Sequence, residues 1–329
     1  MTSMEKKERN WIPASFFPVS PLILVPEALG EFSVYLRQNK EFVLYARSGE
    51  KFTAEQRVKL FESGVGEVFV QTVEKPGFDK YVEDNLGGIL TDESLPMQER
   101  SRLFYEATAN VVRDAFNDKL PPRLMEEKFV RIESMVRQSM DFLKDERALK
   151  AIGPFISHDY KTYTHSLHVF VYALSLLACF DVPEEEHFEY GLGAMLHDIG
   201  KTRIPLKVLN KRGALTQEER SLVETHSVQG VALCAGLDIS QRTFNCILFH
   251  HERMDGTGYP SGIGGMDIPL AVKCITIADV FDALTSNRPY APAMRAYDAL
   301  ILMRHEMAGA FDMSVYKRFI EMLSGSSLI

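Results

Sequence analysis

The stretch LGAMLHDIGK, from Leu192 to Lys201, ends an apolar run on an adjacent histidine and aspartate. A charge taken out of water is costly unless it is paired or bound to a metal ion, so His197 and Asp198 require partners from elsewhere in the chain. The fold has to bring those partners to this point. The positions of the other histidines and aspartates therefore limit what the chain can form.

Four further histidines and one aspartate lie in segments that are otherwise apolar or tightly patterned. They are His165, His226, His250, His251 and Asp279. His165 stands at the start of the nearly apolar stretch Thr164–Ala178, which predicts a helix buried in a bundle. Each residue alone also fits a core histidine, a helix cap or a solvated helix end. Taken with His197 and Asp198, the set suits two cations bridged by a carboxylate.

These residues lie in two motifs that resemble those of the HD-GYP domain, a branch of the HD superfamily of metal-dependent phosphohydrolases. The first motif is HDIGK (His197–Lys201), and the second is HHERMDGTGYP (His250–Pro260). The likeness extends from about Ala148 to Leu323. It implies an all-α helical bundle, and characterised members of the family hydrolyse the bacterial second messenger cyclic di-GMP.

The resemblance implies how the ligands divide between two ions. One ion would be held by His165, His197, Asp198 and Asp279, and Asp198 would bridge to a second ion held by His226, His250 and His251. The family favours iron or manganese, although histidine and carboxylate ligands by themselves also suit nickel and zinc. Some HD-GYP proteins hold a third ion through a glutamate four residues before the first histidine ligand. Here that residue is Lys161, so we expect two divalent ions.

The resemblance also assigns residues to catalysis and substrate binding. Asp198 and Lys201 would be catalytic, with a water that bridges the two ions as the nucleophile and Lys201 on the phosphate as a point charge. Asp282 would either orient a metal ligand or contact the guanine end of the substrate. The other expected substrate contacts are Asp255, Gly258, Tyr259 and Arg288.

Some positions depart from the family pattern. Many members carry a basic residue directly after the RPY tripeptide, where this chain has Ala291, so one phosphate contact is expected to be missing. Four histidines match no ligand position and are expected at the surface or in packing: His158, His168, His187 and His305.

The first part of the chain has a different pattern. Short β-rich runs predict strands over residues 21–25, 32–36, 41–46 and 67–71. A helix is predicted over 53–63, where Thr53 and Gln56 have the spacing of a capping box. Two helices follow, from Pro96 to about Asn117 and over 124–143, separated by a break at Pro121 and Pro122.

We therefore expect three parts in a chain of 329 residues. A small α+β domain over 1–95 would be a regulatory or partner-binding module, residues 96–147 would form a helical linker, and residues 148–329 would form the HD-GYP helical bundle. Two protein interactions are considered: the first domain would bind a protein partner, and the chain would form a homodimer.

Charge and apolar patterning limit the compartment and the other partners. A net charge of -8 argues against binding a nucleic acid polymer or anionic lipid. No apolar run reaches the roughly 20 residues that span a bilayer, and the amino terminus lacks the apolar core of a secretory signal. We expect a cytoplasmic protein without membrane contact, whose four cysteines are reduced.

The function implied by the resemblance is hydrolysis of cyclic di-GMP to linear pGpG, with GMP left open as a further product. Two alternatives stay open at this point. One is a cyclic di-GMP receptor whose metal site no longer turns over, and the other is a hydrolase of another cyclic dinucleotide, such as cyclic GMP-AMP.

Overall fold

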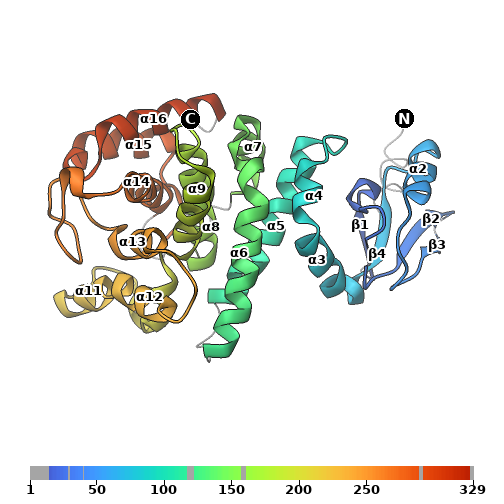
Figure 1. Cartoon of the computed structure of the whole chain (residues 1–329), viewed down its shortest axis with the longest axis horizontal. Helices are drawn as coiled ribbons and strands as arrows, with labels where there is room; N and C mark the ends of the chain where they lie inside the picture. Colours follow the sequence, from blue (N-terminus) through green and yellow to red (C-terminus); the bar gives the residue numbers. More distant parts are fainter. Residues whose placement is uncertain are drawn as a thin grey trace. The chain divides into compact units, whose positions relative to one another are not determined.

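The structure, a computed structural model, describes residues 15–28, 30–39, 41–116, 122–156, 161–288 and 292–326. It divides into two compact units, Met1–Leu103 and Phe104–Ile329. Among the residues that the structure describes, the strands all lie in the first unit and the elements of the second unit are helices (Figure 1). The expected order, an α+β domain followed by a helical bundle, is confirmed. Because the division falls inside helix α5 (Met97–Phe116), the separate linker over 96–147 stays a prediction.

The first unit is built on a four-stranded antiparallel sheet with the strand order β1-β4-β2-β3. Its strands are β1 (Phe16–Val19), β2 (Val34–Gln38), β3 (Glu41–Ala46) and β4 (Val68–Gln71). The helices of this unit are α2 (Ala54–Glu62), α3 (Lys75–Asp84) and α4 (Leu86–Thr91), with 3-10 turns η1 (Pro21–Ile23) and η2 (Thr72–Glu74). The Thr53 and Gln56 side chains each accept the other residue's backbone N–H, at 3.1 and 2.8 Å, so the predicted capping box is confirmed.

The predicted strand over residues 21–25 is wrong, because this segment begins with η1. The Ser20 hydroxyl accepts the Leu22 N–H at 3.3 Å and Pro21 opens the turn. Ile23 and Leu24 are 0% and 1% exposed, so their apolar pattern reflects burial in the core. The strand β1 was not expected because it contains Pro18, which an edge strand tolerates.

The described elements of the second unit are helices joined by loops. Its α-helices after α5 are α6 (Pro122–Lys144), α7 (Glu146–Ile152), α8 (Thr162–Leu177), α9 (Glu184–Leu196), α10 (Leu206–Leu209), α11 (Gln217–Glu224), α12 (His226–Cys234), α13 (Gln241–Phe249), α14 (Leu270–Thr285), α15 (Ala296–Glu306) and α16 (Met313–Ser326). Short 3-10 turns are η3 (Gly153–Phe155), η4 (Ile199–Arg203), η5 (Gly265–Asp267) and η6 (Ala308–Ala310).

Helix α8 forms the centre of this bundle. It packs against α9 and α14, and α9 packs in turn against α13 and α6. Every residue of α8 from Thr164 to Leu177 is buried, which explains why its sequence is apolar on all sides. Polar side chains placed on this helix must therefore find their partners inside the bundle.

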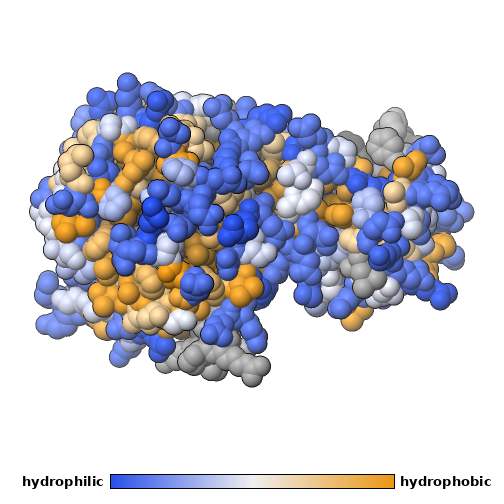
Figure 2. Space-filling model, viewed as in Figure 1, coloured by the Kyte–Doolittle hydropathy of each residue, from blue (hydrophilic) through white to orange (hydrophobic). Residues whose placement is uncertain are grey.

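Polar residues are spread over the face drawn in Figure 2, with apolar areas between them. Within the described ranges, none of the helices combines the length and the apolar character needed to cross a bilayer.

Candidate metal centre

His197 and Asp198 lie where α9 passes into η4, His197 at the carboxyl end of α9 and Asp198 at the start of η4. Both are 0% exposed. A Cβ atom on Gly200 would lie 1.9 Å from the backbone oxygen of His226, so only glycine allows η4 to lie this close to α12. The glycine that follows the histidine–aspartate pair therefore lets His226 approach Asp198.

Two groups of side chains each bring their ligand atoms within 4.8 Å of one another. The first group is His165, His197 and Asp279, and the second is Asp198, His226, His250 and His251. Their elements are α8, the α9–η4 junction, α12, the end of α13 and α14. The structure thus brings together all the residues that were expected as metal ligands.

Asp198 lies between the two groups and turns one carboxylate oxygen toward each. Its Oδ2 atom is 3.5 Å from Nε2 of both His165 and His197. Its Oδ1 atom is 3.3 Å from Nε2 of His226 and 3.8 Å from Nε2 of His250. A carboxylate in this position can bind two cations at once.

Asp279 also spans the two groups. Its Oδ1 atom is 2.9 Å from Nε2 of His165, and its Oδ2 atom is 3.7 Å from Nδ1 of His251. The centre is therefore a continuous cluster in which both carboxylates face histidines on each side.

Backbone carbonyls fix the tautomers of three histidines. The Nδ1 atoms of His197, His226 and His250 lie 2.7, 2.7 and 2.8 Å from the carbonyl oxygens of Ala194, Val223 and Ile247. Because a carbonyl only accepts, each Nδ1 carries the proton and each Nε2 carries a lone pair directed into the centre. This is the usual arrangement of histidines that bind metal ions.

Buried acceptor atoms inside the cluster test whether a cation fits. Nε2 of His197 and Oδ1 of Asp198 are buried without a hydrogen-bond partner among the described residues. Nε2 of His226 lies 3.1 Å from Nε2 of His250. Buried acceptors that converge in this way are stabilised by a cation, and imidazole nitrogens with carboxylate oxygens suit iron, manganese, nickel or zinc.

The surroundings also set the protonation states that ligands need. Burial holds the pKa of His250 well below its ordinary value and lowers the pKa of His251 to about 3. Burial alone would raise the pKa of Asp198, but the ammonium of Lys201 holds that pKa well below its ordinary range. Neutral imidazoles beside ionised carboxylates are the forms that bind divalent ions.

Lys201 lies at the edge of this cluster. Its ammonium donates to Oδ2 of Asp198, and its side chain is 13% exposed. The expected phosphate-binding residue therefore touches the carboxylate that joins the two groups.

The DGTGYP loop is folded against Glu252, which the sequence reasoning did not single out. Glu252 is 1% exposed, and its Oε1 atom accepts the N–H groups of Ser261 at 2.6 Å and Gly262 at 3.1 Å. A Cβ on Gly258 would lie 2.5 Å from the Glu252 Cα atom, so this position requires glycine. The ring of Tyr259 comes to lie 4.7 Å, centroid to centroid, from the ring of His251. Glu252 could have been found from its place inside the HHE tripeptide.

The other expected substrate contacts have different surroundings. Asp255 accepts hydrogen bonds from Arg253 and from the backbone and hydroxyl of Thr257, within the loop itself. Asp282 is 1% exposed and lies behind His165, at 2.6 Å from its Nδ1 atom. This position favours the role of orienting a ligand over contact with guanine. Arg288 is half-buried, and Ala291 lies outside the described residues.

The histidines that match no ligand position differ from one another. His187 is buried, with Nε2 3.2 Å from the Leu174 carbonyl oxygen, and His305 is exposed on α15. His168 is buried and hydrogen-bonded to Asp282 and Tyr105, contacts that the sequence pattern did not indicate. His158 lies outside the described residues.

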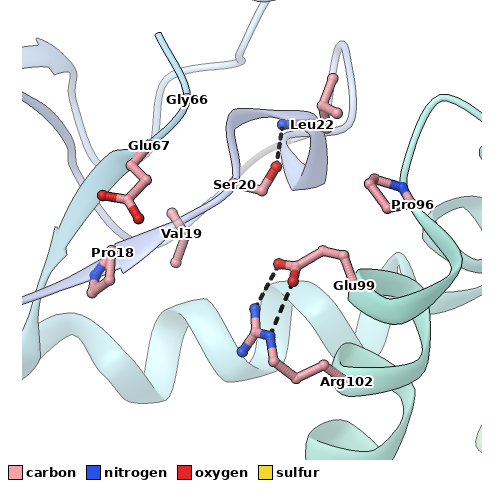
Figure 3. Close-up of a pocket in the computed structure, with 9 residues that line it drawn as sticks. All are labelled: Pro18, Val19, Ser20, Leu22, Gly66, Glu67, Pro96, Glu99 and Arg102. Carbon is pink, nitrogen blue, oxygen red and sulfur yellow. Dashed lines mark hydrogen bonds and ion pairs between the residues drawn. The ribbon is translucent and has the colours of Figure 1, made fainter. Parts of the chain in front are cut away.

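The first unit has a pocket of its own, with a volume of about 460 Å³ (Figure 3). It is lined by Pro18, Val19, Ser20, Leu22, Gly66, Glu67, Pro96, Glu99 and Arg102. Arg102 is paired with Glu99 at 2.7 Å. Because Glu67 adds a second carboxylate, the lining does not favour an anionic ligand.

Comparison with known proteins matches a family model to part of the second unit. Residues 157–315 match the model of the HD domain. A solved structure titled "Bd1817, a HDG"Y"P protein from Bdellovibrio bacteriovorus" has a similar fold over 94% of this chain and 99% of that chain, with a TM-score of 0.63 and 19% sequence identity.

Three curated relatives are similar in sequence. "Cyclic di-GMP phosphodiesterase PA4108" of Pseudomonas aeruginosa is 36% identical over 56% of this chain and 44% of its own length. "Cyclic di-GMP phosphodiesterase response regulator RpfG" of Xanthomonas campestris pv. campestris is 42% identical over 39% of this chain and 35% of its own length. "3'3'-cGAMP-specific phosphodiesterase 3" of Vibrio cholerae is 34% identical over 46% of this chain and 33% of its own length. This chain thus spans less than half the length of these relatives.

Proposed function

We propose that this chain is a metal-dependent phosphodiesterase that hydrolyses cyclic di-GMP to linear pGpG. The observation that carries the proposal is the position of Asp198, with one carboxylate oxygen turned toward each of two ligand groups. A phosphodiester is a poor electrophile because its negative charge repels a nucleophile. Two cations near one carboxylate would neutralise more of that negative charge than a single cation would.

The chain's own residues would divide the work in the following way. His165, His197 and Asp279 would hold one ion, and His226, His250 and His251 the other, with Asp198 shared between them. Bound divalent ions would supply charge neutralisation for the phosphate and a lower pKa for the attacking water. Lys201 would hold a phosphate oxygen through its ammonium, and Tyr259 would form one wall of the substrate site.

The reaction consumes one water molecule. The water oxygen bonds to phosphorus, the bond from phosphorus to the 3′ oxygen breaks, and the released proton returns to that 3′ oxygen. The product is the linear dinucleotide pGpG with a 5′ phosphate, and a second hydrolysis of the same kind would give GMP. We place this activity in the cytoplasm, and the partner of the first unit and a homodimer stay predictions.

The choice of cyclic di-GMP as substrate is supported by the names of the relatives from P. aeruginosa and X. campestris. A second candidate is cyclic GMP-AMP, because a relative of 34% identity is named as specific for it. Both cyclic dinucleotides contain phosphodiester groups and at least one guanine, so the residues that would hold the metal ions do not distinguish between these substrates.

A turnover comparison on the purified chain tests the proposal. Protein loaded with Fe²⁺ or Mn²⁺ under anaerobic conditions is incubated separately with cyclic di-GMP, 3′3′-cyclic GMP-AMP and cyclic di-AMP, and the products are separated by chromatography. We expect the fastest release of a linear dinucleotide from cyclic di-GMP and none with Asp198→Ala. Binding of cyclic di-GMP without release of product would instead support a receptor, and faster turnover of cyclic GMP-AMP would overturn the choice of substrate.

A further inference from the structure

A chain of hydrogen bonds connects helix α5 with the expected metal ligand His165. The Tyr105 hydroxyl lies 2.9 Å from Nε2 of His168, whose Nδ1 atom lies 2.8 Å from Oδ1 of Asp282. The other oxygen of Asp282 lies 2.6 Å from Nδ1 of His165. His165, His168 and Asp282 are each 1% exposed, so these polar groups are satisfied inside the bundle.

The acceptors in this chain set the direction of each hydrogen bond. Ionised Asp282 only accepts, so both histidines donate to it from Nδ1. Nε2 of His168 is then an acceptor, and the Tyr105 hydroxyl donates to it. In the same tautomer, Nε2 of His165 carries the lone pair that faces Asp198 and Asp279. The arrangement therefore fixes the form of His165 that binds a cation.

The helices hold this arrangement in place. His165 and His168 are three residues apart on α8 and share one face, and Asp282 stands three residues after Asp279 on α14. The Ser286 hydroxyl adds a contact to Oδ1 of Asp282 at 3.3 Å. One carboxylate thus holds a metal ligand with one oxygen and a second histidine with the other.

We propose that Tyr105 and His168 are positioning residues for the metal centre, which act through Asp282 on the orientation of His165. The inference rests on the proposed function only in taking His165 as a metal ligand. Tyr105 precedes the residues that match the HD domain model, 157–315, so a residue of α5 completes the support of the centre. Burial of polar groups costs free energy that apolar packing would avoid. A role in positioning His165 accounts for the presence of these polar groups inside the bundle.

Titration of the full-length apoprotein with Mn²⁺ tests this inference without any substrate. The protein is stripped with chelator, and Mn²⁺ affinity and stoichiometry are measured by calorimetry for the wild type, Tyr105→Phe, His168→Leu and His168→Asn. We expect His168→Leu to weaken binding in at least one step by roughly 10- to 100-fold, the range typical for loss of a group that supports a metal ligand. Tyr105→Phe should weaken it less, because His168 still donates to Asp282.

The remaining variants separate positioning from general loss of stability. The side-chain amide of His168→Asn can occupy the place of Nδ1 and still donate to Asp282, so it should recover much of the affinity lost in His168→Leu. Tyr316→Phe is the matched control, because it removes another buried hydroxyl, which donates to the Leu300 carbonyl oxygen at 2.6 Å. Wild-type Mn²⁺ affinity in both Tyr105→Phe and His168→Leu would overturn the inference. An equal loss in Tyr316→Phe would also overturn it, whereas a wild type that binds Mn²⁺ but hydrolyses nothing would contradict only the proposed function.

Discussion

The Nε2 atoms of His226 and His250 face each other at 3.1 Å, although both rings have their Nδ1 protons engaged by backbone carbonyls. Each Nε2 atom therefore presents a lone pair to the other. Two lone pairs at this distance repel each other unless a cation or a proton lies between them. Burial lowers the pKa of both rings, and so a metal ion is the better candidate for that position.

Metal binding should consequently stabilise the folded chain. At a free Mn²⁺ concentration 100 times its dissociation constant, one site adds about 2.7 kcal/mol to the free energy of unfolding. For a unit of this size that gain raises the melting temperature by roughly 5–10 °C. Thermal unfolding of the stripped protein with and without Mn²⁺ measures the effect.

Asp198→Ala provides the matched control, because it removes the carboxylate that faces both groups. We expect the melting temperature of this variant to be insensitive to Mn²⁺. A Mn²⁺-dependent rise as large as that of the wild type would show that Asp198 is not the shared ligand.

Lys201→Ala should lower the rate while leaving the metal content unchanged. An ammonium has no lone pair for a cation, yet it lies against Asp198, where a phosphate oxygen would be neutralised. Loss of one preorganised donor typically costs about 10²-fold or more in kcat. Turnover of cyclic di-GMP is measured beside metal content, with the exposed Lys207→Ala as the control. Loss of metal from Lys201→Ala would contradict its role on the phosphate.

Glu252 should stabilise the loop that carries Tyr259. Glu252→Ala leaves the N–H groups of Ser261 and Gly262 without their acceptor, so we expect a loss of about 1–3 kcal/mol in the free energy of unfolding. Glu252→Gln keeps an oxygen at the same position and should lose less. Urea unfolding of the two variants makes the comparison, and equal losses would show that the charge, not the acceptor, is what matters.

The proposed ligand set could be named from the sequence because those residues occupy distinct motifs. Helical spacing and the close approach at Gly200 then bring the motifs together. The hydrogen bonds that position His165 could not be predicted from the sequence in the same way. Tyr105 is a single aromatic residue on an amphipathic helix, and His168 lies in an apolar run where a packing residue is equally expected. Only the fold shows that both lie behind Asp282.

The first unit was predicted less accurately, because its short apolar runs are buried for more than one reason. Ile23 and Leu24 read as a strand, yet the Ser20 cap and Pro21 favour a 3-10 turn. The strand β1 was not predicted, and it contains Pro18. A proline argues against a central strand but not against an edge strand. Whether a short apolar run forms a strand depends on the neighbouring strand and not on the local sequence pattern.

The predicted number of metal ions depends on the residue four positions before His165. Lys161 stands just before α8, its carbonyl oxygen accepts the His165 N–H at 2.9 Å, and its ammonium lies 5.8 Å from the centroid of the Tyr163 ring. A lysine offers no lone pair and repels a cation, so the carboxylate that would hold a third ion is replaced by a positive charge. We expect elemental analysis of protein purified without chelator to approach two metals per chain. Lys161→Glu supplies the missing carboxylate on the same side of the helix and should raise the content toward three. A reproducible value near three in the wild type, with no change in Lys161→Glu, would show that the third ion does not depend on this position.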